Sequence, residues 1–368
     1  DIKCLLPGHA MQVRPNSNSF TTNEFKYWNF IPDSDPPPIT EERALECIGE
    51  EIEKAVKSHL LADVEVGAFL SGGADSTAIV AIANEYLNDK IRTFSRGFGN
   101  PDGDELPLAR ETANKLGTIH TEGIVSEEDF HASLDSLLDV FDQPFSDTSL
   151  VPTERVSSLA AKDVKVVLTG DGGDEAFGGY DYGWYISPLL EPCAKSLDSL
   201  GAIKNYMSSY LDRFYYLAFG ADKWRNNHNN LLKRRRSRMR INSLLGKSVA
   251  RELREYDPTW AYDIHRNLEI DSFREVMWMG VKVLLPNQYL VKVDRSSMKN
   301  SLEARAPFLS HTLLEAMLNL PTNVRNPEHN WYKGLFRSWL SDKIPEGVLN
   351  EQKRGFAVPR SWQPVLTG

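Results

Sequence analysis

Cysteine is scarce in this chain: three occur among 368 residues, at the widely spaced positions 4, 47 and 193. A disulfide framework or a cysteine-based zinc site needs paired or closely spaced cysteines, so neither is expected, and the reducing cytoplasm is the favoured location. Long apolar runs are also missing, because the longest, such as residues 66–70, are far shorter than the roughly 20 residues that a membrane-spanning helix needs. With 42 basic against 51 acidic residues and a net charge of −9, the chain is not expected to bind nucleic acid.

The two ends of the chain lack the features of natural termini. Asp1 is not a starting methionine, no signal-peptide pattern follows it, and the chain stops shortly after an aromatic residue, Trp362. Both ends are therefore interpreted as cuts through a longer polypeptide. Residues 1–40 are rich in proline and polar side chains and end in a run of three prolines, which disfavour helix. This segment is predicted to be an extended connector from a domain that precedes it.

Apolar periodicity after residue 40 predicts helices that alternate with short buried strands. Thr40 followed by two glutamates is typical of a helix start, and the next residues place apolar side chains on one helical face. Helices are predicted at 41–59, 76–86, 106–116 and 151–161, and strands at 64–70, 91–98, 119–125 and 164–169. This alternation predicts an α/β fold with a doubly wound parallel sheet, and a nucleotide-binding domain over residues 41–190.

The pattern changes after Tyr180. Residues 191–368 have many helical periodicities and no convincing strands, so a mostly helical substrate and catalytic region is predicted there. Within it, residues 226–240 are basic and rich in asparagine. A solvated helix or loop is the favoured interpretation of this stretch, and contact with an anionic partner is the alternative.

The loop Ser-Gly-Gly-Ala-Asp-Ser-Thr, residues 71–77, lies directly between a predicted strand and a predicted helix. Its adjacent glycines leave the backbone amides open to an oxyanion, and the helix that follows directs its free N–H groups at the same point. Asp75 would repel a bound phosphate, and a divalent cation between them resolves this; Mg²⁺ suits oxygen ligands. The Walker A pattern is absent, so a kinase-like or GTPase-like γ-phosphate site is not indicated.

A second glycine-rich loop, residues 169–175, also follows a predicted strand and carries Asp171 and Asp174. In doubly wound sheets, ligands bind beyond the carboxyl ends of the strands. If the strands before the two loops are neighbours, Asp75 and Asp174 can share a metal ion. A glycine-rich connection with solvated acids is the less favoured interpretation.

These loops resemble those of a known family. Ser-Gly-Gly-x-Asp-Ser is the pyrophosphate loop of the N-type ATP pyrophosphatase (PP-loop) superfamily, and residues 170–180 resemble the matching loop of glutamine-dependent asparagine synthetases. Further blocks fit that family in the right order, at residues 93–98, 117–120, 294–298, 301–309 and 353–362. The resemblance therefore covers nearly the whole chain, from about Leu6 to Trp362.

Some positions depart from the family pattern. Ala74 and Arg96 replace larger aliphatic residues, and Ser310 stands where aspartate is usual. Asp171 stands where some relatives have a glutamate or a tyrosine. The family's amino-terminal glutaminase domain, which uses an N-terminal cysteine nucleophile, is not within this sequence, and Cys4 is interpreted as a linker cysteine.

The resemblance implies an ATP-dependent ligase that adenylates a substrate carboxylate, releases pyrophosphate and passes ammonia or an amine to the activated carbon. Aspartate is the favoured substrate, and the glutaminase domain would supply the ammonia. Mg²⁺ would bind Asp75 and Asp174. The residues implied in binding ATP and pyrophosphate are Phe69, Leu70, Ser71, Gly72, Gly73, Asp75, Ser76, Thr77, Arg96, Thr169 and Gly170.

Three catalytic residues are implied by the same resemblance. Lys353 matches the family's late lysine and would stabilise charge at the α-phosphate. An ordinary surface lysine is the alternative interpretation, and the motif match favours the catalytic one. Asp171 would take a proton from the attacking amine. Glu303 is a second candidate for that role. A structural salt bridge from Glu303 to Arg305 or Arg295 is an equally favoured interpretation. His120 is expected to be structural, and Lys333 is expected to meet a nearby acid.

Alternatives remain within and outside this class. β-Lactam synthetase-like or peptide-cyclising relatives would form an amide within one substrate. A catalytically silent interaction module is disfavoured, since an inactive site has no need to retain its charged residues together: Asp75, Asp171, Asp174 and Lys353. A sulfur-transfer or tRNA-modifying enzyme would need reactive cysteines and a basic face, which the composition does not provide. The oligomeric state stays open, with a homodimer among the options.

Overall fold

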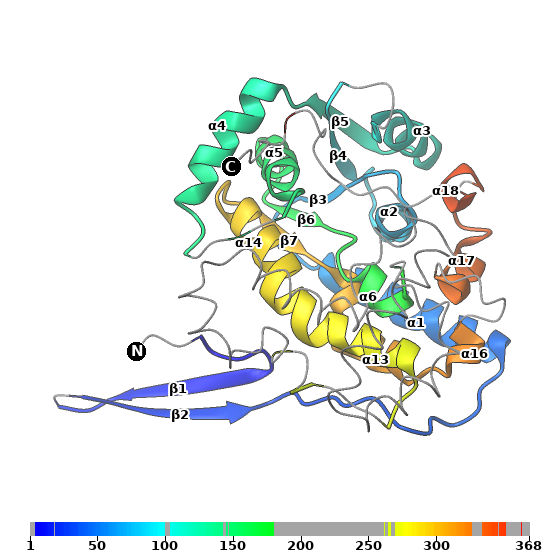
Figure 1. Ribbon diagram of the computed structural model, residues 1–368. Helices are drawn as coiled ribbons and strands as arrows, with labels where there is room; N and C mark the ends of the chain where they lie inside the picture. The colour runs from blue at the N-terminus through cyan, green and yellow to red at the C-terminus, as the bar shows by residue number, and fades with distance from the viewer. Residues whose placement is uncertain are drawn as a thin grey trace, which may run out of the picture.

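The five-stranded sheet at the centre of the molecule is parallel throughout, with strand order β5-β4-β3-β6-β7 (Figure 1). Its strands are β3 (Val66–Phe69), β4 (Arg92–Gly97), β5 (Ile119–Ile124), β6 (Val166–Leu168) and β7 (Glu303–Arg305). The first four confirm the strands that apolar patterning predicts. Because β3 pairs with β6, the two glycine-rich loops leave neighbouring strands, which confirms the condition for a shared site.

The computed structural model describes residues 4–17, 19–99, 104–142, 145, 147–179, 261, 264–265, 269–325, 333–344, 346–350 and 362. Two predicted features lie outside these residues, namely the basic stretch at 226–240 and the late lysine block with Lys353. In the part of the chain that is described, no helix combines the length and apolar character needed to cross a membrane.

Helices cover both faces of the sheet. One face packs against α1 (Glu41–His59) and α2 (Ala74–Tyr86), and α3 (Leu106–Leu116) lies beside β4 and β5. The other face is covered by α4 (Glu127–Leu138), α5 (Leu150–Ala160) and α14 (Leu290–Met298) (Figure 1). This arrangement confirms the doubly wound α/β class.

Local sequence accounts for how two of these helices begin. Thr40 caps α1, because its side chain accepts a hydrogen bond from the Arg43 N–H at 3.3 Å, and α1 has the predicted bounds. Helix α4 was not among the predicted elements. It begins with a capping box in which Ser126 and Asp129 each accept a hydrogen bond from the other's backbone N–H.

Where the structure describes the region 191–368, it is mostly helical, as predicted, and it shares a core with the first half of the chain. Apolar residues of α15 (His311–Asn319) and α17 (Gly334–Leu340) pack with those of α1 and α2 in one buried cluster. Helix α6 (Gly173–Phe177) follows β6 in the first half of the chain. The other helices among the described residues of the C-terminal part are α13 (Ser272–Met279), the π-helix η3 (Gly280–Tyr289), the 3₁₀ turn η4 (Pro307–Leu309), α16 (Thr322–Arg325) and α18 (Glu346–Asn350).

Two strand predictions are corrected by the structure. The C-terminal region contributes β7, a strand of three residues that is too short for periodicity to reveal. Residues 1–40 are not simply extended, because β1 (His9–Pro15) and β2 (Phe20–Lys26) form an antiparallel hairpin. The hairpin projects from the rest of the molecule (Figure 1), and its polar, proline-flanked sequence lacks a buried face that would mark it as strand.

Candidate active site

The loop after β3 is a tight turn at the N-terminus of α2. Gly72 has φ +78°, a left-handed conformation that favours glycine, and Gly73 is the N-cap of the helix. The Ser76 hydroxyl accepts from the Ser71 N–H at 3.1 Å and donates to the Gly73 carbonyl at 3.2 Å. The first amides of α2 have no partner within the helix, so the turn presents the oxyanion-binding geometry that the sequence predicts.

Backbone hydrogen bonds anchor each of the two loops to a neighbouring strand. The Leu70 N–H donates to the Phe94 carbonyl at 3.0 Å, and the Thr169 N–H donates to the Arg305 carbonyl at 2.8 Å. Gly170 lies against Asp75, since a Cβ at that glycine would be 3.0 Å from the Asp75 Cβ. Phe69 and Thr77 pack inward, where Phe69 joins an apolar cluster and Thr77 is fully buried.

Asp75 and Asp174 come together from the two loops, as predicted, and they share one partner. The Lys333 Nζ lies 2.5 Å from each carboxylate oxygen of Asp75 and 2.8 Å from Asp174 Oδ1. All three side chains are largely buried, at 25%, 16% and 10% exposure for Asp75, Asp174 and Lys333. The expectation that Lys333 meets a nearby acid is confirmed, and the structure adds that it meets two.

The two carboxylates hold Lys333 in its charged form. Burial by itself lowers the pKa of this ammonium group, but the negative charges of Asp174 and Asp75 outweigh burial and raise the pKa above that of an ordinary lysine. Lys333 has φ +54°, a left-handed conformation that is uncommon for a side chain with a Cβ. Strain of this kind persists where the surroundings fix the residue, here through two ion pairs.

Small residues make the cluster possible. A Cβ at Gly173 would lie 2.7 Å from Asp75 Oδ1, and a Cβ at Gly179 would overlap both Asp174 and Lys333. The glycines of the second loop therefore serve close approach of charged groups. Two carboxylates converging on one positive centre beside an oxyanion-binding turn have the donor chemistry that Mg²⁺ prefers. Within the described ranges, no group of three or more potential metal ligands occurs.

Asp171 lies in the same loop, between β6 and α6, and is partly buried. Burial raises its pKa, the positive charge of Lys292 acts in the opposite direction, and the charges of Asp174 and Asp147 add to the rise. A carboxylate whose pKa is raised is a better proton acceptor at neutral pH than an ordinary aspartate. The position and the pKa both suit the predicted role as a base.

Glu303 lies apart from these carboxylates. It begins β7 opposite Val166, the first residue of β6, whereas Asp171 follows the end of β6. Its side chain is 56% exposed and forms an ion pair with Arg305 at 2.7 Å. Of the two interpretations that the sequence leaves open, the structure shows the salt bridge.

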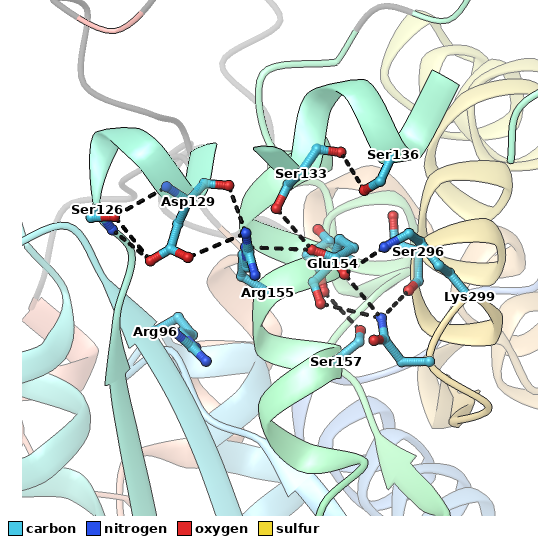
Figure 2. Close-up of polar contacts among 12 residues, drawn as sticks. Arg96, Ser126, Asp129, Ser133, Ser136, Glu154, Arg155, Ser157, Ser296 and Lys299 are labelled. Carbon is cyan, nitrogen blue, oxygen red and sulfur yellow. Dashed lines mark hydrogen bonds and ion pairs between the residues drawn. The ribbon is translucent and has the colours of Figure 1, made fainter. Parts of the chain in front are cut away.

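Arg96 extends from the carboxyl end of β4 along the face that α4 and α5 cover (Figure 2). Its Nη1 donates to the Ile124 carbonyl at 3.1 Å, and its guanidinium lies over Gly123, where a Cβ would be 2.6 Å away. Burial lowers the pKa of Arg96, and the charge of Arg155 lowers it further. His120 is structural, as expected, because its Nδ1 is 2.9 Å from the Thr93 hydroxyl.

Sequence reasoning missed one group of polar residues beside Asp171. Lys292 of α14 donates a hydrogen bond to Ser149 Oγ at 2.7 Å and lies 3.6 Å from Asp147 Oδ2. The only local signal is a lysine between two valines in α14. Its partners lie 143 residues away in the chain, so no spacing rule could have joined them.

The order of these elements agrees with a family model. The model described as asparagine synthase matches residues 48–365, which include both loops, Lys333 and β7. The chain belongs to the asparagine synthase family. This membership confirms the resemblance that the two glycine-rich loops indicate.

Individual relatives agree with this assignment. The chain is 30% identical over 374 residues to asparagine synthetase [glutamine-hydrolyzing] 1 of Bacillus subtilis, covering 98% of this chain and 56% of the relative. A putative asparagine synthetase [glutamine-hydrolyzing] of Mycobacterium bovis is 32% identical, with 90% and 51% covered. Amidase chyE of Penicillium rubens is 24% identical, with 98% and 59% covered. The chain thus spans about half the length of the curated relatives that it matches.

Proposed function

We propose that this chain is the synthetase part of an ATP-dependent amide-forming ligase. It adenylates a carboxylate, releases pyrophosphate, and passes ammonia or an amine to the activated carbon, with aspartate as the favoured substrate. The observation that carries this proposal is the meeting of Asp75 and Asp174 beside the glycine turn of α2, within a chain of the asparagine synthase family.

The turn at residues 71–77 binds the leaving pyrophosphate in this proposal. Its backbone amides and the N-terminus of α2 stabilise negative charge, and the hydroxyls of Ser71 and Ser76 lie at the same turn. Asp75 and Asp174 would hold Mg²⁺, which supplies charge neutralisation on the phosphate oxygens when bound. Lys333 contacts both carboxylates, so its positive charge offsets their mutual repulsion and holds them side by side.

Asp171 is the proposed proton acceptor for the attacking nitrogen, because it lies in the loop that also carries Asp174. Lys353 is the proposed cation for charge at the α-phosphate, on the motif match alone. Arg96, at the end of β4, is proposed to line the nucleotide side of the site. The two described cysteines, Cys4 and Cys47, are free thiols, which supports a cytoplasmic location.

The nitrogen source is proposed to be ammonia from a glutaminase segment. The curated relatives named as glutamine-hydrolyzing are about twice as long as the matched region, and they carry that activity in their names. Isolated, this chain should therefore accept free ammonium.

The decisive experiment is pyrophosphate release by the chain with Mg·ATP, ammonium and a panel of carboxylic acids. Release that depends on one amino acid and yields its amide supports the proposal. Amide formation with glutamine at the rate seen with ammonium would contradict the proposal that a separate glutaminase segment supplies the ammonia. An ATP-binding chain that forms no amide from any acid in the panel would favour a silent module.

A further inference from the structure

Helices α6 and α17 carry the two ends of an ion pair in the candidate active site, and both are short. Asp174 lies in the first turn of α6, which has five residues, and Lys333 is the N-cap of α17, which has seven. Isolated helices of fewer than about 12–15 residues are marginally stable in water. Gly172 and Gly178, both in the left-handed conformation, end α6 on either side. Packing against the rest of the fold must therefore fix where these two helices lie.

The ion pair does not supply that fixing force. Lys333 Nζ lies 2.8 Å from Asp174 Oδ1, and the two side chains are only 10% and 16% exposed. Taking two such charges out of water costs about as much free energy as their attraction returns. The ion pair is therefore held in place by the fold around it and does not by itself hold α6 and α17 together.

Two stacked rings join the same helices close to these charges. Phe177 comes three residues after Asp174 in α6, and Phe336 comes three residues after Lys333 in α17. The two rings stack with centroids 4.2 Å apart and planes 4° from parallel. Residues three apart lie on one side of a helix, so the ring and the carboxylate of α6 face the same neighbour. The two helices thus meet twice, at the rings and at the charges.

A third ring encloses the stack. Phe308 of η4 meets Phe177 and Phe336 edge-on, with centroids 5.3 and 5.6 Å away and planes at 87° and 90°. All three side chains are at most 3% exposed. Aromatic pairs of this kind add stability beyond the area that they bury, and a close-packed interior leaves little space for a ring to shift. Neither helix can slide along the other without breaking the stack.

We propose that the Phe177–Phe336 stack is the positioning contact of the candidate active site, and that it sets the place of Lys333 between Asp75 and Asp174. Neither ring touches a reacting group; each acts through the charged residue three positions before it. The kinetic consequence rests on the proposed function, whereas the placement of Lys333 does not. Loss of the stack lets α17 move and opens Lys333 to water.

The first test measures how well Lys333 is protected from acetic anhydride, which modifies amines in their uncharged form. Wild type, Phe336→Ala and Phe336→Leu receive a short pulse of reagent while folded, and mass spectrometry reads the modification of Lys333. Loss of one pKa unit of charge stabilisation raises the uncharged fraction about tenfold, so Phe336→Ala should react at Lys333 about tenfold faster than wild type. Phe336→Leu keeps apolar volume but no flat ring, and it should react at an intermediate rate.

The matched control is Phe94→Ala, because Phe94 is also fully buried but lies in a separate apolar cluster beside α5. It should lower thermal stability and leave the reaction rate of Lys333 unchanged. An equal rise in this control would show general loosening and would overturn the inference. Wild-type rates in both Phe336 variants would overturn it as well, and Phe336→Leu decides the matter if Phe336→Ala does not fold.

The second test measures pyrophosphate release by the same proteins with Mg·ATP, ammonium and aspartate. A misplacement of about 1 Å can cost about 100-fold in rate, so Phe336→Ala should lose about 10- to 100-fold in kcat/KM and need more Mg²⁺. Phe94→Ala should keep the wild-type Mg²⁺ dependence. Unchanged kinetics in Phe336→Ala, despite faster reaction of Lys333, would overturn the positioning role. A wild type that protects Lys333 but releases no pyrophosphate would count against the proposed function alone.

Discussion

Lys299 and Lys333 are both largely buried against carboxylates, and their surroundings differ. Lys299 lies at the end of a helix and pairs with Glu154, whose oxygens also accept from Ser133 and Asn300. Lys333 lies at the start of a short helix and pairs with two carboxylates from the first turns of α2 and α6, each just after a strand.

The difference indicates which cluster is built for a ligand. Glu154 receives donors from α4, α5 and the α14 region, so its charge is balanced by groups that hold the helices together (Figure 2). At Lys333 the negative charges outnumber the ammonium, and the adjoining turn offers backbone amides. An excess of negative charge beside an oxyanion site is useful when a cation and a phosphate bind there together. Turnover and stability measured on the same variants separate these two roles.

The largest expected effect is on turnover in Asp171→Asn. Removing the proposed base should lower the rate of amide formation by about 10²–10⁴-fold. Amide formation with saturating Mg·ATP and ammonium measures this effect. Glu303→Gln is the matched comparison and should retain turnover within about tenfold. The Glu303 carboxylate pairs with Arg305 and lies beside the start of β6, whereas Asp171 follows the end of that strand. A larger loss in Glu303→Gln than in Asp171→Asn would reverse the assignment.

The same Asp171→Asn variant also tests the raised pKa through stability. A carboxyl group whose pKa is higher in the folded than in the unfolded state favours folding when protonated, and that contribution is lost as pH rises through the folded pKa. Asparagine does not ionise, so Asp171→Asn should have a higher Tm than wild type at neutral pH. The gain should shrink toward pH 4, as thermal unfolding scans across that range would show. A lower Tm for the variant at neutral pH would contradict the raised pKa.

The next effect distinguishes the Lys333 cluster. Asp174→Asn should lower Mg·ATP-dependent pyrophosphate release by about 10²–10³-fold, because it removes a charge proposed to hold the cation. Titration of Mg²⁺ at fixed ATP should show a weaker apparent affinity. Asp75→Asn should behave alike, since both carboxylates contact the same centre. A variant with wild-type Mg²⁺ dependence would show that this pair is structural.

Lys299→Met should affect stability and not chemistry. Breaking a buried pair leaves Glu154 without its closest cation and costs about 3–5 kcal/mol. Denaturant unfolding of Lys299→Met and wild type measures the loss, with turnover assayed under conditions where both remain folded. A drop in kcat at full folding would place this anchor in the catalytic machinery.

The sequence predicts those parts of the site that depend on residues close together in the chain. The two loops and their carboxylates are local signals, because glycine pairs between a strand and a helix have few other uses. The pairing of Lys333 with Asp75 spans 258 residues, so the sequence could suggest an acid partner but not identify it. Strand β7 was missed because three residues are too few to show an alternating pattern. The contacts of Lys292 were missed because its partners come from a distant segment of the chain.

The smallest expected effect is within the Glu154 cluster, in Ser133→Ala. The Ser133 hydroxyl donates to Glu154 Oε2 at 3.2 Å and is buried, yet Lys299 still contacts the other oxygen of the same carboxylate at 3.1 Å. Removing a neutral donor while the charged one remains should cost about 1 kcal/mol, well below the cost of Lys299→Met. Both variants change one group around one carboxylate, so their difference in unfolding free energy isolates the contribution of charge. Equal losses would mean that packing between α4 and α5, and not the Lys299–Glu154 pair, holds this anchor together.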